Sequence, residues 1–213
     1  MLHDLVKWCF EKSLEGGYLG VAGLMAMEST IVPIPSEVII PPAAYWASQG
    51  KLTYFGVIAA GTIGSVVGAA VMYWLSLYVG RPLLVKYGKY VLIKPAKIEA
   101  AEHFVARYQT GGIFFARLLP VVRHLIGIPA GLVRMPVGPY LLMTFLGSAV
   151  WCSVLTWFGA SVLGDHPELL KDPDGLLKVL KGESLKIAAA VVVLAVAYVA
   201  MVKMTRPQEA PKT

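Results

Sequence analysis

The sequence predicts an all-α membrane protein with two inverted repeats and an additional C-terminal transmembrane helix. Of its 213 residues, 57% are hydrophobic and 15% are charged, whereas soluble domains are roughly 45–50% apolar and about 25% charged. Residues 52–80 and 135–164 are uncharged stretches of 29 and 30 residues, longer than the roughly 20 residues that span a bilayer. Each of these stretches follows a segment in which charged residues and prolines separate shorter apolar pieces. This repeated order predicts two copies of a broken segment followed by a long transmembrane helix.

The two broken segments, residues 17–50 and 108–134, are each predicted to be a re-entrant helix hairpin. The uncharged runs of the first segment are 12 and 13 residues long, too short to span the bilayer. Pro33 and Pro35 interrupt the first segment and Pro120 the second, because proline lacks the backbone donor of a helix interior. A hairpin returns to the face that it entered, so a single crossing by the next long helix inverts the second copy. A full span with a kink is the alternative for each broken segment.

The other predicted elements complete a single membrane domain. Residues 1–16 carry several charges and no cleavable signal pattern, which indicates an N-terminal interfacial helix. The basic stretch 81–107 is predicted to be a cytoplasmic loop with an amphipathic helix, because positive loops stay inside. Residues 165–186 are the predicted external loop. Residues 187–203 are predicted to form a short last transmembrane helix, followed by the cytoplasmic tail 204–213. The protein is thus expected to be a multi-pass protein of the cell membrane. The sequence does not decide on which side of the membrane the N-terminus lies.

Four charged residues lie inside the broken segments, away from their ends: Glu28 and Glu37 in the first, Arg117 and Arg123 in the second. Ionisable groups at membrane depth are costly, and they usually face partners, a wet cavity or a transport path. Because an arginine fork binds phosphate or carboxylate with two donors, the arginines are predicted to hold an anion. The two acids would balance that charge and exchange a proton. Ion pairs that only tie the repeats together are the structural alternative.

Other patterns indicate packing rather than chemistry. The small residues Ala60, Gly64 and Gly68 recur every four residues, which is typical of closely packed membrane helices. His124 follows an arginine and is either a proton relay or, more commonly for such a residue, a structural hydrogen-bonding group. The two cysteines lack metal-ligand spacing, so neither a metal site nor a disulfide is expected.

Several strings of the chain together resemble the DedA family of membrane proteins, the SNARE-associated or VTT-domain group. They are ESTIVPIPSEVIIPPA, GSVVGAAVMYWLSLYVGRPLLVKYGKY and FFARLLPVVRHLIGIPAGLVRMP, followed by LGSAVW. The resemblance implies two oppositely oriented re-entrant hairpins and a role in moving lipids across the bilayer. Bacterial members are linked to undecaprenyl phosphate recycling and eukaryotic relatives to phospholipid scrambling, with dependence on the proton-motive force. The resemblance also implies that function depends on Glu28, Glu37, Arg117 and Arg123.

Two positions depart from the family pattern. The arginine motif is commonly followed by Pro-Gly, whereas Val121 follows Pro120 here, and a side chain at that point limits close backbone approach. A polar residue often follows the family tryptophan, whereas Cys152 follows Trp151. These departures bear on the substrate more than on the fold.

The leading functional hypothesis is a flippase- or scramblase-like translocase for a lipid phosphate, such as undecaprenyl phosphate or a phospholipid. The lipid bilayer and this substrate are the expected partners, with protons in a coupling role and no nucleic acid. No cofactor and no enzymatic activity are expected. A proton-coupled transporter of a small soluble ion is the first alternative, and a membrane enzyme acting on lipid phosphates is the second. The sequence leaves open the direction of movement and the oligomeric state.

Overall fold

In the part of the chain that it describes, the computed structural model contains helices joined by turns, and no strands. The described residues are 15–30, 35–87, 110–119 and 122–165 with residues 103, 105 and 196, and only the backbone is described at 79–87 and 162–165. The elements are α2 (Gly17–Glu28), η1 (Ser36–Val38), α3 (Ile40–Ser48), α4 (Tyr54–Tyr87), α6 (Val122–Leu125), α7 (Gly127–Leu132) and α8 (Val137–Asp165). Residues 110–118 form a further helical stretch. The predicted N-terminal helix, external loop, last transmembrane helix and tail lie almost entirely outside the described residues, as does most of the predicted cytoplasmic loop.

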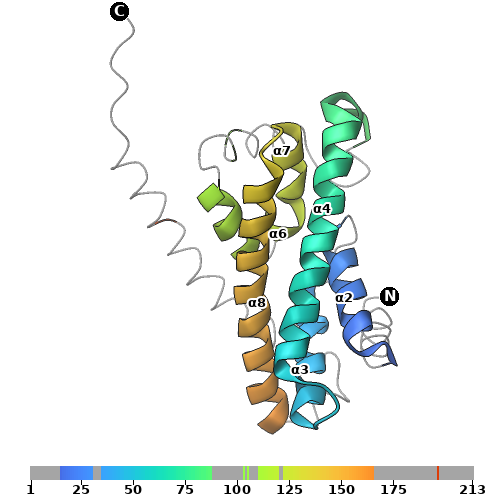
Figure 1. Cartoon of the computed structure of the whole chain (residues 1–213), viewed down its shortest axis with the longest axis vertical. Coiled ribbons are helices and arrows are strands. Elements are labelled where there is room, and N and C mark those ends of the chain that lie inside the picture. The colour runs from blue at the N-terminus through green and yellow to red at the C-terminus, as the bar shows by residue number, and fades with distance from the viewer. Residues whose placement is uncertain are drawn as a thin grey trace, which may run out of the picture.

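The two long apolar helices that the sequence predicts are α4 and α8. Their segments Tyr54–Tyr78 and Val137–Ser161 are 25 residues each and apolar enough to cross a membrane. At about 1.5 Å per residue they exceed the ~30 Å hydrocarbon core. The two helices pack against each other along the long axis of the molecule (Figure 1). The prediction of an all-α fold with two long apolar helices is therefore confirmed.

Prolines and turns divide the broken segments into short helices. Pro35 has an extended backbone and precedes the first residue of η1. Helix α3 has prolines in its first turn, where the missing N–H costs no helical bond. In the second segment, α6 and α7 are only four and six residues long. Because these helices are short, the residues at their ends can direct side chains toward the interior of the protein.

The short helices pack on both long helices in an exchanged pattern. Helix α2 packs along α4, whereas α3 crosses to pack on α8, and α7 packs on α4. In Figure 1, α2 and α7 lie beside different halves of α4. Gly64 and Gly68 of α4 lie directly against backbone carbonyl groups of α2, where a Cβ atom would collide. The second helix of each broken segment thus packs on the long helix of the other half of the chain.

Helices α3 and α7 end in the same capping motif. The residue after the C-cap of each helix has a left-handed backbone, with φ of +74° at Gly50 and 51° at Arg134. In both motifs the N–H of this left-handed residue donates a hydrogen bond to the carbonyl three residues earlier. The N–H of the following residue donates to the carbonyl five residues before it. This is the Schellman arrangement, in which glycine is the usual left-handed residue. Arg134 adopts this conformation despite its Cβ atom, which makes it the strained member of the pair.

Candidate functional site

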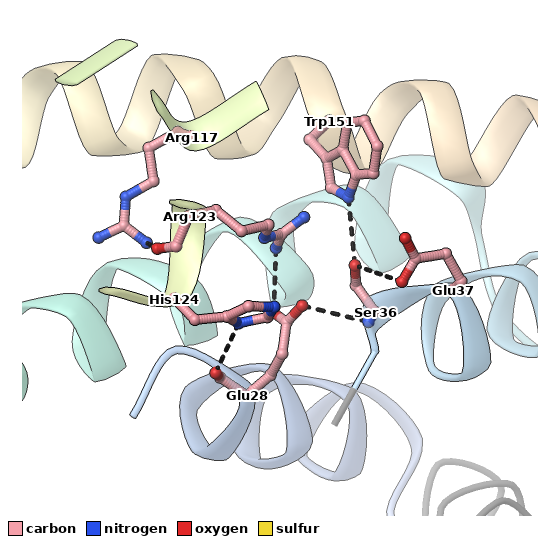
Figure 2. Close-up of polar contacts among 7 residues, drawn as sticks. All are labelled: Glu28, Ser36, Glu37, Arg117, Arg123, His124 and Trp151. Carbon is pink, nitrogen blue, oxygen red and sulfur yellow. Dashed lines mark hydrogen bonds and ion pairs between the residues drawn. The ribbon is translucent and has the colours of Figure 1, made fainter. Parts of the chain in front are cut away.

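The first acid and the second arginine of the predicted set form a buried ion pair. Glu28 is the last residue of α2, and Arg123 lies in α6. The Nη2 atom of Arg123 lies 3.0 Å from Oε2 of Glu28, and the side chains are 3% and 0% exposed, respectively. Figure 2 shows the pair bridging the two segments. Side chains 95 positions apart in the sequence therefore meet at one point.

Ser36 joins both acids to the long helix α8. Its backbone N–H, which starts a 3-10 turn and so lacks a helical partner, donates to Oε1 of Glu28 at 3.1 Å. Its hydroxyl donates to Oε2 of Glu37 at 3.5 Å and accepts from Nε1 of Trp151 at 3.1 Å. Glu37 is only partly buried, in contrast with Glu28. The two acids thus belong to one network but have different access to the surroundings.

Arg117 completes the network through neutral partners. Its Nη1 donates to the backbone carbonyl of Arg123 at 2.9 Å, and its Nη2 donates to the hydroxyl of Tyr140 at 3.1 Å. That hydroxyl donates in turn to the carbonyl of Ala69 in α4 at 3.2 Å. Gly147 of α8 has room for the Arg117 side chain, since a Cβ there would lie 2.7 Å from the arginine Cβ. The structure therefore brings all four predicted charges together.

The buried part of the site has more positive than negative charge. Among the described residues, the fully buried charged groups are Glu28, Arg117 and Arg123. Two donor atoms, Nε of Arg117 and Nη1 of Arg123, are buried and have no hydrogen-bond partner within the described part of the chain. An uncompensated buried charge is strongly unfavourable. The arrangement can accept an anion that neutralises this charge and occupies both donors.

His124 and Trp151 hold the arginine segment in place. Nδ1 of His124 lies 3.0 Å from the backbone carbonyl of Glu28, and since a carbonyl only accepts, this nitrogen is the donor. The guanidinium of Arg123 lies 5.5 Å from the ring centroid of Trp151, within cation–π range. His124 contacts the backbone of the acid, not its carboxylate. This geometry corresponds to the structural hydrogen-bonding alternative for His124.

Three residues of the network were not predicted to belong to the site: Ser36, Tyr140 and Trp151, the last of which was noted only as the family tryptophan. Serine, tyrosine and tryptophan are ordinary in membrane helices, so composition gave no signal for them. Among the predicted helix-breaking residues, Pro35 lies at the start of η1, and Pro33 and Pro120 are outside the described residues. Within the described ranges, no group of three or more His, Cys, Asp or Glu side chains could hold a metal ion.

Comparison with known proteins places the chain in a family. The VTT domain matches residues 34–161. Undecaprenyl phosphate transporter A of Bacillus subtilis (strain 168) is 42% identical over 144 residues, which cover 67% of this chain and 70% of that protein. Undecaprenyl phosphate transporter A of Staphylococcus aureus (strain NCTC 8325 / PS 47) is 27% identical over 189 residues, covering 87% and 89%. An alkaline phosphatase-like protein of Lactococcus lactis subsp. lactis (strain IL1403) is 39% identical over 163 residues, covering 72% and 74%.

The chain belongs to the VTT-domain family of membrane proteins, the DedA or SNARE-associated group, as the sequence strings predicted. No solved structure matches it.

Proposed function

We propose that this protein is a translocase that moves a polyprenyl phosphate, with undecaprenyl phosphate as the leading candidate, across the cell membrane. Relatives named undecaprenyl phosphate transporter cover most of the chain. The phosphate group would bind at Arg117 and Arg123 while the polyprenyl tail stays in the hydrocarbon. A charged headgroup at the bilayer centre costs several kcal/mol or more without a partner, so a protein site is needed to lower that barrier.

The observation that carries this proposal is the pair of unused arginine donors. Nε of Arg117 and Nη1 of Arg123 are buried without a partner among the described residues, and Arg117 contacts no acid in its two hydrogen bonds. A phosphate monoester offers three acceptor oxygens and a charge near −2. It would satisfy both donors and neutralise the excess positive charge of the buried groups.

Glu28 would control access to the phosphate site by competing for Arg123. A phosphate on the unused Nη1 of Arg123 and Glu28 on Nη2 would share one guanidinium, so the two like charges would repel each other and the ion pair with Glu28 would weaken when phosphate binds. A proton on Glu28 would weaken this ion pair and favour the phosphate. Glu37, which shares Ser36 with Glu28 and is partly buried, would pass the proton to or from the surroundings. This gives a physical basis for coupling to the proton-motive force.

An inverted-repeat architecture with two re-entrant hairpins accompanies this proposal. The exchanged packing of α3 on α8 and α7 on α4, and the identical caps at Gly50 and Arg134, support it. Because the basic loop 81–107 and the tail carry the excess of Lys and Arg, we place both in the cytoplasm. The site would then open to alternate faces as one half moves against the other.

Reconstitution into liposomes tests the proposal. Undecaprenyl phosphate added to the outer leaflet should become protected from an impermeant phosphatase at a rate that depends on the protein. Arg123→Ala should abolish this protection, and Arg134→Gly, which removes an exposed arginine outside the network, should leave it unchanged. Protection by Arg123→Ala at the native rate would remove the arginine from the mechanism.

The same liposomes separate translocation from the two alternatives. A lipid-phosphate enzyme would release inorganic phosphate without added phosphatase, whereas the translocase should release none. A transporter of a soluble ion would carry inorganic phosphate into liposomes that contain no polyprenyl lipid. The name of the Lactococcus lactis relative makes the enzyme control necessary.

A further inference from the structure

Helices α4 and α8 carry rows of buried hydroxyl groups on their inner faces. On α8, Thr144, Ser148 and Thr156 lie on one i, i+4 row, which Cys152 completes. On α4, Thr62, Ser65 and Ser76 fall on one face at helical spacing. All six hydroxyl-bearing residues are at most 3% exposed. Serine and threonine are common where membrane helices pack, and the ion-pair network does not use these six side chains.

Exposed serines on α8 behave differently from the buried rows. The hydroxyls of Ser153 and Ser161 donate to the carbonyls of the residues four positions earlier, at 2.8 Å and 3.0 Å. A helical serine or threonine can satisfy its hydroxyl in this way. The hydroxyls of the buried Ser65, Ser76, Thr144 and Thr156 instead have no hydrogen-bond partner among the described residues. These four hydroxyls are therefore available to bind a ligand within the helix pair.

The two rows approach the charged network from both long helices. Tyr140, which bonds Arg117, lies one turn before Thr144 on α8. The thiol of Cys152 on α8 lies within hydrogen-bonding reach of the Thr62 hydroxyl on α4, so the rows meet where α4 packs on α8. The twelve-residue separation of Thr144 and Thr156 corresponds to about 18 Å along the helix. This is more than half of the ~30 Å hydrocarbon core.

We propose that these hydroxyls bind a file of water molecules that runs between α4 and α8 to Arg117 and Arg123. A hydroxyl both donates and accepts, and a buried water needs two to four polar partners, which successive hydroxyls along the rows supply. The file would hydrate the charged network and give protons a route to it through an otherwise apolar interior. The inference holds whichever anion the arginines bind.

Radiolytic labelling of the reconstituted protein tests the water file, because hydroxyl radicals formed from bound water oxidise the side chains next to it. The labelling rates of Cys152 and Leu155 are compared by mass spectrometry, each relative to its rate in the denatured chain. Both are on α8 and at most 1% exposed, but only Cys152 lies on the hydroxyl row. We expect Cys152 to be labelled several-fold faster than Leu155 on this scale. Equal protection of the two residues would overturn the proposal without any mutation.

Variants then connect the labelling to the hydroxyls. Thr144→Val with Thr156→Val keeps the side-chain shape and removes two hydroxyls, so it should lower Cys152 labelling several-fold. The control, Ser153→Ala with Ser161→Ala, removes two satisfied, exposed hydroxyls from the same helix and should leave the rate unchanged. Labelling that is insensitive to the threonine variant, or equally sensitive to both variants, would contradict a hydroxyl-lined file.

Discussion

The two broken segments have similar packing and opposite charge. In each, a first helical stretch leads to a buried charged residue, and a second short helix packs on the long helix of the other half, α3 on α8 and α7 on α4. The first segment ends its leading helix with Glu28, whereas the second provides Arg117 and Arg123. Two segments with similar packing therefore contribute opposite charges to one site. Acids and arginines meet only because they come from segments that face each other from opposite halves.

Breaking the contact between the halves should have the largest effect. In Arg123→Met, Glu28 remains fully buried without its ionic partner, so the free energy of unfolding should fall by about 3–5 kcal/mol. Denaturant titration in detergent micelles measures this change. A native free energy of unfolding in Arg123→Met would mean that the pair does not join the segments.

A double replacement separates stability from function. Arg123→Met combined with Glu28→Met removes both charges together and should recover most of the stability, because a buried ion pair adds little over apolar packing. Translocation of undecaprenyl phosphate should stay absent in this double variant. If the double variant translocates lipid at the native rate, the charges are structural only.

Tyr140→Phe tests the neutral side of the network. It removes the hydroxyl that links Arg117 to the α4 carbonyl of Ala69. A hydrogen bond to a charged group contributes about 1.5–3 kcal/mol, so we expect a loss of that size in the free energy of unfolding. Tyr78→Phe, at a residue that is 82% exposed, is the matched control and should change nothing.

Gly64→Ala tests the packing of the first segment. A Cβ at this position would collide with the carbonyl of Ala22 in α2, and a backbone atom cannot rotate away. Overpacking of this kind costs about 1–3 kcal/mol, to be measured by the same titration. Gly23→Ala, which has no atom within 4 Å of its added Cβ, should be neutral or slightly stabilising. Equal stability of the two variants would argue against close contact between α2 and α4.

The sequence alone predicted the four charged residues and the two long helices, because a charge or its long absence is visible without knowing the fold. It could not assign partners. That Arg123 pairs with Glu28 while Arg117 bonds Tyr140 depends on where α6 and the stretch 110–118 lie against α8. Ser36 was equally hidden, because its role comes from a backbone N–H at a helix start. The exchanged packing likewise depends on contacts between distant segments.

The smallest expected effect concerns the matched caps at Gly50 and Arg134. Because Arg134 holds a left-handed backbone that favours glycine, Arg134→Gly should raise the free energy of unfolding by about 1 kcal/mol. Gly50→Ala should lower it by a similar amount. Thermal unfolding of the two variants measures both changes. A lower stability of Arg134→Gly would show that contacts of the arginine side chain contribute more to stability than its left-handed backbone costs.

The most direct test of the shared site is the affinity of the protein in nanodiscs for undecaprenyl phosphate, measured by native mass spectrometry. If the phosphate and Glu28 share the guanidinium of Arg123, Glu28→Gln removes a repelling negative charge and should bind more tightly than the native protein. Arg123→Gln removes the phosphate's partner and should bind more weakly. We expect the order Glu28→Gln, native, Arg123→Gln from tightest to weakest. Weaker binding by Glu28→Gln, or native affinity in Arg123→Gln, would contradict a phosphate site built from both halves.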